Sequence, residues 1–90
     1  MVLRSINPNK CIHHNVNLEK VRRYKKAMEL GNIFPAVEVL FHNNQYYVRD
    51  GAHRVSAAKD LNIPILAEVF TMDEYPNRWL LGKRLSWKLR

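Results

Sequence analysis

The sequence contains one cysteine, few acidic residues and no long apolar run. Its single cysteine, Cys11, cannot form a disulfide within the chain, as is usual for proteins of reducing compartments. No apolar stretch approaches the ~18 residues that a membrane-spanning helix needs, and the first residues lack the apolar core of a secretory signal. We therefore expect a cytoplasmic protein with no membrane partner.

The shortage of acidic side chains leaves a strong positive charge. Eight Asp and Glu stand against fifteen Lys and Arg, so the formal net charge is +7 and the pI is near 9.9. This excess favours an anionic partner such as DNA, RNA, a nucleotide or an acidic surface. The 90 residues, 47% of them hydrophobic, suffice for one modest core, so we expect a single domain over 1–90.

Only three glycines and four prolines occur, and each marks a boundary between expected elements. Residues 4–15 form a polar entry with room for one short strand. Asn15 or Asn17 can cap a helix that runs to about Leu30, where Gly31 supplies a left-handed stop.

The middle of the chain predicts a hairpin, a helix and a third strand. Two β-rich runs, 36–41 and 45–49, flank a turn at Asn43-Asn44. Residues 52–61 have amphipathic helical spacing, and 63–70 is β-branched and apolar. This order of elements predicts an α+β fold, in which helices cover a small mixed sheet. We place the core at about 16–70 and a basic C-terminal helix or tail at 73–90.

The most informative segment is the passage from strand to helix between Tyr47 and Arg54. The first amides of a helix have no internal partners and carry partial positive charge, so they bind phosphate. Gly51 has no side chain to block that approach. The expected phosphate-binding residues are Asp50, Gly51, Ala52, His53 and Arg54.

Three side chains give this turn its chemistry. Arg54 can hold phosphate oxygens with two hydrogen bonds, and His53 can donate a hydrogen bond or move a proton. Asp50 could cap the helix or position a metal-bound phosphate. The structural alternative is an ordinary turn with a surface His-Arg pair that needs no ligand.

A longer set of residues places this turn in a wider pattern. The set comprises Val21, Tyr24, Ala27-Met28, Gly31, Phe34-Pro35, Val37, Val39, Tyr47-Val48, Asp50 to Val55, Ala57-Ala58, Ile63-Pro64 and Val69. Together these residues resemble the ParB N-terminal domain of the ParB/sulfiredoxin superfamily, whose members bind nucleotide phosphates at a glycine turn before a helix. The resemblance implies a ParB/sulfiredoxin-like fold and assigns Gly51, His53 and Arg54 to phosphate-binding positions.

Two departures from the family narrow what the resemblance implies. Sulfiredoxin-like reductases carry their reactive cysteine immediately before the His-Arg pair, where this sequence has Ala52, so thiol repair is not implied. ParB-type CTP switches also need a further C-terminal motif and a helix-turn-helix DNA reader. Only twenty residues follow residue 70 here, so sequence-specific DNA binding is not implied.

The remaining expectations concern partners and metals. A nucleoside triphosphate, ATP or CTP with Mg²⁺, is the expected cofactor, and no structural metal is expected because the histidines lack ligand spacing. Several basic side chains could contact a phosphate backbone, although a charge run can also be merely solvated. The nucleic-acid candidates are Arg22, Arg23, Lys26, Arg78, Lys83, Arg84 and Lys88.

These observations favour a stand-alone ParB-like domain that binds nucleotide or nucleic-acid phosphate at residues 50–54 and associates with DNA. We expect Arg54→Ala to abolish nucleotide binding while leaving the thermal midpoint nearly unchanged. One alternative is a small nuclease or nucleotide-dependent phosphotransferase, with His53 as acid or base and Arg54 stabilising phosphoryl charge. Another is an interaction domain whose C-terminal helix pairs with a second copy, to form a homodimer, or with a larger protein.

Overall fold

The computed structural model describes residues 1–74. The expected C-terminal helix, with Arg78, Lys83, Arg84 and Lys88, lies outside the described residues. The elements in chain order are β1 (Val2–Ile6), the 3-10 turn η1 (Pro8–Lys10), β2 (Cys11–Ile12), α1 (Leu18–Glu29), β3 (Val37–His42), β4 (Gln45–Asp50), α2 (Ala52–Leu61) and β5 (Ile65–Phe70). Within residues 1–74, neither helix is long and apolar enough to cross a membrane.

The strands form one mixed sheet in the order β1-β5-β3-β4-β2. The β1–β5 and β3–β4 pairs are antiparallel, whereas β3–β5 and β2–β4 are parallel. The expected hairpin is confirmed. Its turn residues Asn43 and Asn44 have φ of 51° and 65°, and asparagine tolerates this left-handed conformation better than most residues.

The helices are also those that the sequence predicts. Asn17 is the N-cap of α1, because its side chain accepts hydrogen bonds from the amides of Glu19 and Lys20. Gly31 follows the helix with φ of 86°, which confirms the left-handed stop. The segment 52–61 forms α2 with the expected bounds.

The N-terminal region differs from the prediction of one short strand within 4–15. The structure has two strands there, and β1 begins earlier, at Val2. Only Ile6 of β1 is buried, so the strand lacks the alternation that would reveal it in the sequence. The strand is defined by its antiparallel pairing with β5, from Val2 opposite Val69 to Ile6 opposite Ile65. The local sequence does not indicate this pairing.

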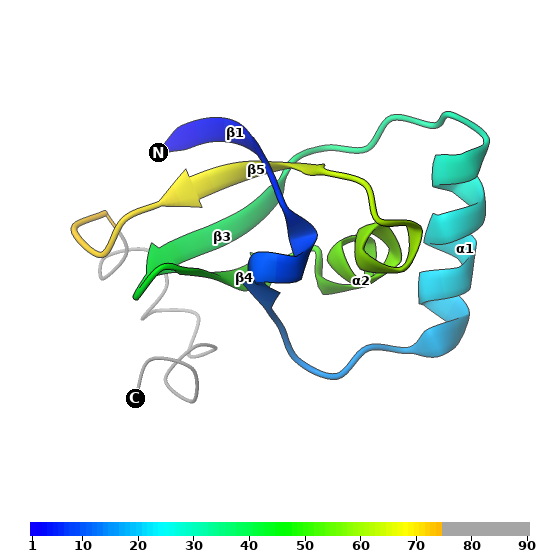
Figure 1. Cartoon of the computed structure of the whole chain (residues 1–90), viewed down its shortest axis with the longest axis horizontal. Helices are drawn as coiled ribbons and strands as arrows, with labels where there is room; N and C mark the ends of the chain where they lie inside the picture. The colour runs from blue at the N-terminus through cyan, green and yellow to red at the C-terminus, as the bar shows by residue number, and fades with distance from the viewer. Residues whose placement is uncertain (75–90) are drawn as a thin grey trace.

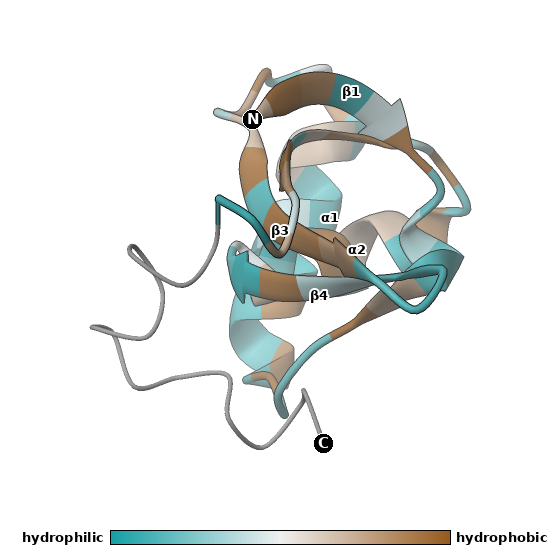
Figure 2. Ribbon diagram, turned by 90° about the vertical axis from the view of Figure 1, so that its left-hand side faces the viewer, coloured by the Kyte–Doolittle hydropathy of each residue, from teal (hydrophilic) through white to brown (hydrophobic). Residues whose placement is uncertain are grey.

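The sheet carries its main core on the side of α2, and α2 lies between the sheet and α1 (Figure 1). The residues of this core are Ile6, Cys11, Val37, Val39, Tyr46, Val48, Val55, Ala67 and Val69. A smaller cluster of Leu40, Tyr47 and Phe70 lies on the opposite face. In Figure 2, brown apolar stretches lie on the strands, whereas α1 is largely hydrophilic.

Candidate functional site

The passage from β4 to α2 depends on Gly51 for two reasons. Gly51 is the N-cap of α2 and has φ of 102°, which side-chain-bearing residues rarely adopt. A Cβ at this position would lie 2.4 Å from Cγ1 of Val37. The missing side chain therefore makes room for the strand beside the turn, a constraint that the sequence analysis did not foresee.

The N-terminus of α2 has no side-chain cap among the described residues. The expectation that Asp50 could cap this helix is wrong, since Gly51 occupies the cap position and Asp50 is the last residue of β4. The first helical turn begins at Ala52, and its backbone N–H groups have no helical partner of their own. This is the feature of the turn that favours a bound anion.

Arg54 is held by partners inside the protein. Its Nη1 donates a hydrogen bond to the carbonyl oxygen of Pro35, and its Nη2 lies 3.5 Å from Oδ2 of Asp50. The side chain is only 13% exposed. Arg54 thus connects the start of α2 to the segment before β3, and two of its nitrogens already have partners within the protein. The expected contact of Arg54 with phosphate stays a prediction.

His53 points to a different neighbour. Its Nε2 accepts a hydrogen bond of 3.1 Å from the backbone N–H of Asn17, the N-cap of α1. A ring nitrogen that accepts must be unprotonated, so this geometry assigns the remaining ring proton to Nδ1. The bond joins the N-termini of the two helices and fixes the imidazole between them.

A cavity of about 420 Å³ opens beside His53. Lys20 and Arg23 line it from one face of α1, since residues three apart lie on the same side of a helix. The lining is completed by Tyr24, Ala27, Phe34 and His53, with no acidic residue among them. The space therefore combines two cations with the imidazole of the predicted motif.

An aromatic pair forms the apolar wall of this cavity. Tyr24 and Phe34 meet edge to face, with ring centroids 5.3 Å apart and an interplanar angle of 69°. Both residues belong to the set that carries the family resemblance, which implies no role for them. Their place beside His53 depends on the packing of α1 against α2, which the sequence does not specify.

The three residues of α1 that the sequence predicts to contact nucleic acid do not all lie on the same side of the helix. Arg23 lines the cavity, whereas Arg22 is exposed and pairs with Glu19 at 3.1 Å. Lys26 is exposed as well. Of these three predicted residues, one therefore lines the cavity beside Lys20, and two lie on the outer surface of α1.

Arg54 lines a separate cavity of about 240 Å³, so the His-Arg pair of the motif does not converge on one space. Phe34 lies between the two cavities and lines both. The walls around Arg54 are mainly apolar, with Met28, Ile63 and Leu66 among them. Of the two cavities, the one beside His53 is therefore the better candidate for an anion, because Lys20 and Arg23 also line it.

Cys11 lies in the core rather than at the site. It is 4% exposed, and burial raises the pKa of its thiol to about 11, although nearby Lys59 acts in the opposite direction. A thiol with so high a pKa is a poor nucleophile near neutral pH. Within residues 1–74, no three His, Cys, Asp or Glu residues are close enough together to hold a metal ion.

No protein-family profile matches the chain, and no curated protein sequence is similar to it. Among solved structures, the crystal structure of sulfiredoxin from Arabidopsis thaliana is similar to this chain. The TM-score is 0.64 at 17% sequence identity, with 81% of this chain and 91% of that chain covered. The α+β fold is thus ParB/sulfiredoxin-like, as the resemblance in the sequence implied.

Proposed function

We propose that the domain binds a phosphate-bearing ligand, either a nucleotide or a nucleic-acid phosphate, in the cavity beside His53. The observation that carries this proposal is that His53 of α2 and two cations of α1, Lys20 and Arg23, line one space. His53 extends from the first turn of α2, whose N-terminus has no side-chain cap among the described residues. The helix N-terminus and the two cations attract negative charge, and His53 can donate a hydrogen bond from Nδ1.

The aromatic wall favours a nucleotide over a bare phosphate ion. Tyr24 and Phe34 offer apolar ring surface beside the cations, as a base requires next to its phosphates. ATP or CTP with Mg²⁺ is the expected form, with the metal carried in by the phosphates. Nucleotides of this kind are plentiful in the cytoplasm, which is the location we expect.

Arg54 enters this proposal as a positioning residue. By holding Pro35 and Asp50, it fixes the start of α2 and the segment that carries Phe34. Ala52 stands where sulfiredoxin-like reductases have their reactive cysteine, so we propose a binding module and no thiol chemistry.

The test is calorimetric titration of the full chain with ATP and with CTP, each with and without Mg²⁺. Arg23→Ala should weaken binding at least several-fold, because it removes a charge-assisted contact. Arg22→Ala is the matched control, since its side chain pairs with Glu19 away from the cavity and should leave affinity unchanged. Equal affinity in both variants would contradict the proposal. Product formed from nucleotide or plasmid and lost in His53→Ala would favour the enzyme alternative.

DNA association through the outer surface of α1 is the second part of the proposal. Arg22, Arg23 and Lys26 could contact phosphates, with further basic residues after residue 74. If six cations contact a duplex, log affinity should fall with log salt at a slope of about −5. Arg22→Ala and Lys26→Ala should each reduce that slope by about 1. Binding that does not respond to salt would exclude this mode.

A further inference from the structure

One face of the sheet carries apolar side chains that no described helix covers. Strand residues alternate between faces, and Val55 of α2 packs with the core on the opposite face. The register of the strands assigns the uncovered side, here called the outer face. Its residues include Leu3, Glu38, Leu40, Tyr47, Leu66, Glu68 and Phe70.

The centre of the outer face needs a covering layer. Leu40, Tyr47 and Phe70 form its apolar cluster, and Ile12 is the other described residue that packs against them. All four belong to strands. Leu40 and Phe70 are only 0% and 3% exposed, although a single sheet layer cannot by itself exclude water from its face.

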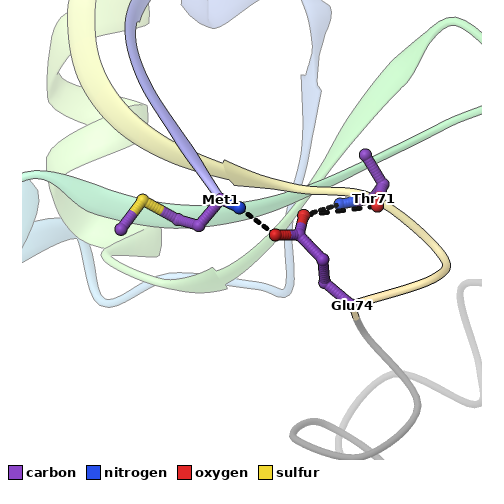
Figure 3. Close-up of polar contacts among 3 residues, drawn as sticks. All are labelled: Met1, Thr71 and Glu74. Carbon is purple, nitrogen blue, oxygen red and sulfur yellow. Dashed lines mark hydrogen bonds and ion pairs between the residues drawn. The ribbon is translucent and has the colours of Figure 1, made fainter.

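The chain leaves β5 next to this cluster. Phe70 ends the strand, and Glu74 is then held by both the amide and the hydroxyl of Thr71 and by the N-terminal amino group of Met1 (Figure 3). These contacts fix the last described residue beside the end of the sheet. The segment 75–90 therefore starts within a few residues of the outer face.

The segment 75–90 has the composition that such a face would bind. Its large apolar residues are Trp79, Leu80, Leu81, Leu85, Trp87 and Leu89. It contains five Lys and Arg and no acidic residue. On the outer face, Glu38 and Glu68 are direct neighbours across the parallel β3–β5 pair. Arg49 of β4 already lies 3.8 Å from Glu38, so Glu68 is the carboxylate with which a cation from outside the sheet would pair.

We propose that the segment 75–90 binds the outer face of its own domain. The apolar side chains pack on the cluster of Leu40, Tyr47 and Phe70, and a basic side chain pairs with Glu68. This assignment competes with the expectation that the tail binds DNA or pairs two copies, because a segment that is packed against the sheet has its tryptophans occupied.

Tryptophan fluorescence of the full chain tests this proposal directly, because both tryptophans of the protein, Trp79 and Trp87, lie in the segment. We expect emission at a shorter wavelength, and acrylamide quenching several-fold weaker, than in a synthetic peptide of residues 75–90. Emission and quenching that match the free peptide would overturn the proposal.

Two matched pairs of variants identify the surface involved. Phe70→Ala should move the emission toward that of the peptide, whereas Phe41→Ala, which removes a ring next to Tyr46 on the opposite face, should not. Glu68→Lys should have a similar effect without altering the core, and Glu29→Lys on exposed α1 is its control. Because Glu68 is only partly buried, this pair remains decisive if Phe70→Ala unfolds.

Measurements at several protein concentrations distinguish a segment 75–90 that binds its own domain from one that binds the outer face of a second copy. Binding within one chain predicts the same quenching over a hundredfold dilution and a monomer mass by light scattering. Quenching that rises on dilution, together with a dimer mass at high concentration, would assign the face to a second copy. Shielded tryptophans that respond to added DNA but not to Phe70→Ala or Glu68→Lys would also contradict the proposal.

Discussion

The backbone N–H of Asn17 donates a 3.1 Å hydrogen bond to Nε2 of His53, and this contact joins the N-termini of the two helices. The side chain of Asn17 meanwhile caps α1 through the amides of Glu19 and Lys20. One residue therefore orients both the imidazole and the helix that brings Lys20 and Arg23 to the cavity. Its two functions can be separated by mutation.

Asn17→Ala should lower the free energy of unfolding by about 1 kcal/mol, because it removes the cap of α1. It should also weaken nucleotide binding, since the first turn of α1 carries Lys20. Asn17→Ser retains a capping oxygen and is the control for both effects. Urea denaturation and calorimetry measure the two quantities. A full loss of affinity with unchanged stability would show that Asn17 acts on the ligand directly.

Gly51→Ala should be among the most destabilising substitutions in the chain. The new Cβ would lie 2.4 Å from Cγ1 of Val37 in a backbone conformation that disfavours side chains, so we expect a cost of about 3 kcal/mol. Gly31→Ala provides the comparison. Gly31 also has positive φ, but nothing lies within 4 Å of its would-be Cβ, so only the backbone cost of about 1 kcal/mol applies. An equal loss of stability in the two variants would contradict the predicted clash between a Cβ at position 51 and Val37.

Arg54→Ala should lower stability rather than leave the thermal midpoint nearly unchanged, as the sequence alone suggested. The substitution leaves the exposed Pro35 carbonyl without its donor and Asp50 without its cation, at a cost of about 1 kcal/mol. Thermal unfolding of Arg54→Ala and Arg54→Lys measures this effect. An unshifted midpoint in Arg54→Ala would mean that its guanidinium serves the ligand instead.

The thiol of Cys11 should make folding stability depend on pH in the alkaline range. Burial raises its pKa from 9.0 to about 11 in the folded state. The free energy of unfolding should therefore be unaffected by this thiol below pH 9. It should fall by about 2–3 kcal/mol as the pH rises toward 11, because the thiol ionises more readily in the unfolded chain. Denaturation at several pH values should show a steeper loss in the native protein than in Cys11→Ala. Parallel curves would contradict the assignment.

Local signals in the sequence predicted the parts of the fold that depend on local chemistry. Asn17 as a cap, Gly31 as a stop and Asn43-Asn44 as a turn each act through their own backbone. Strand β1 was missed because its identity depends on pairing with β5, sixty residues later in the chain. An exposed strand has no alternation of apolar and polar residues, so its sequence does not reveal a partner strand so far along the chain.

In the candidate site, too, the sequence predicts the local backbone structure but not the contacts between distant residues. The turn at Gly51 and the start of α2 follow from the sequence, but the partners of the motif side chains do not. Nothing near Arg54 in the chain indicates that the Pro35 carbonyl will take its guanidinium. The position of Lys20 and Arg23 beside His53 likewise arises from the packing of α1 against α2.

The central claim, that an anion binds in the cavity beside His53, is tested most directly by a two-dimensional ¹H–¹⁵N NMR titration of the full chain with ATP or CTP and Mg²⁺. The amides of Ala52, His53 and Arg54 should shift most, together with those of Lys20 and Arg23, and the shifts should saturate with ligand. Saturating shifts that centre on the separate cavity beside Ile63 and Leu66, or no shifts in residues 51–54, would contradict the account.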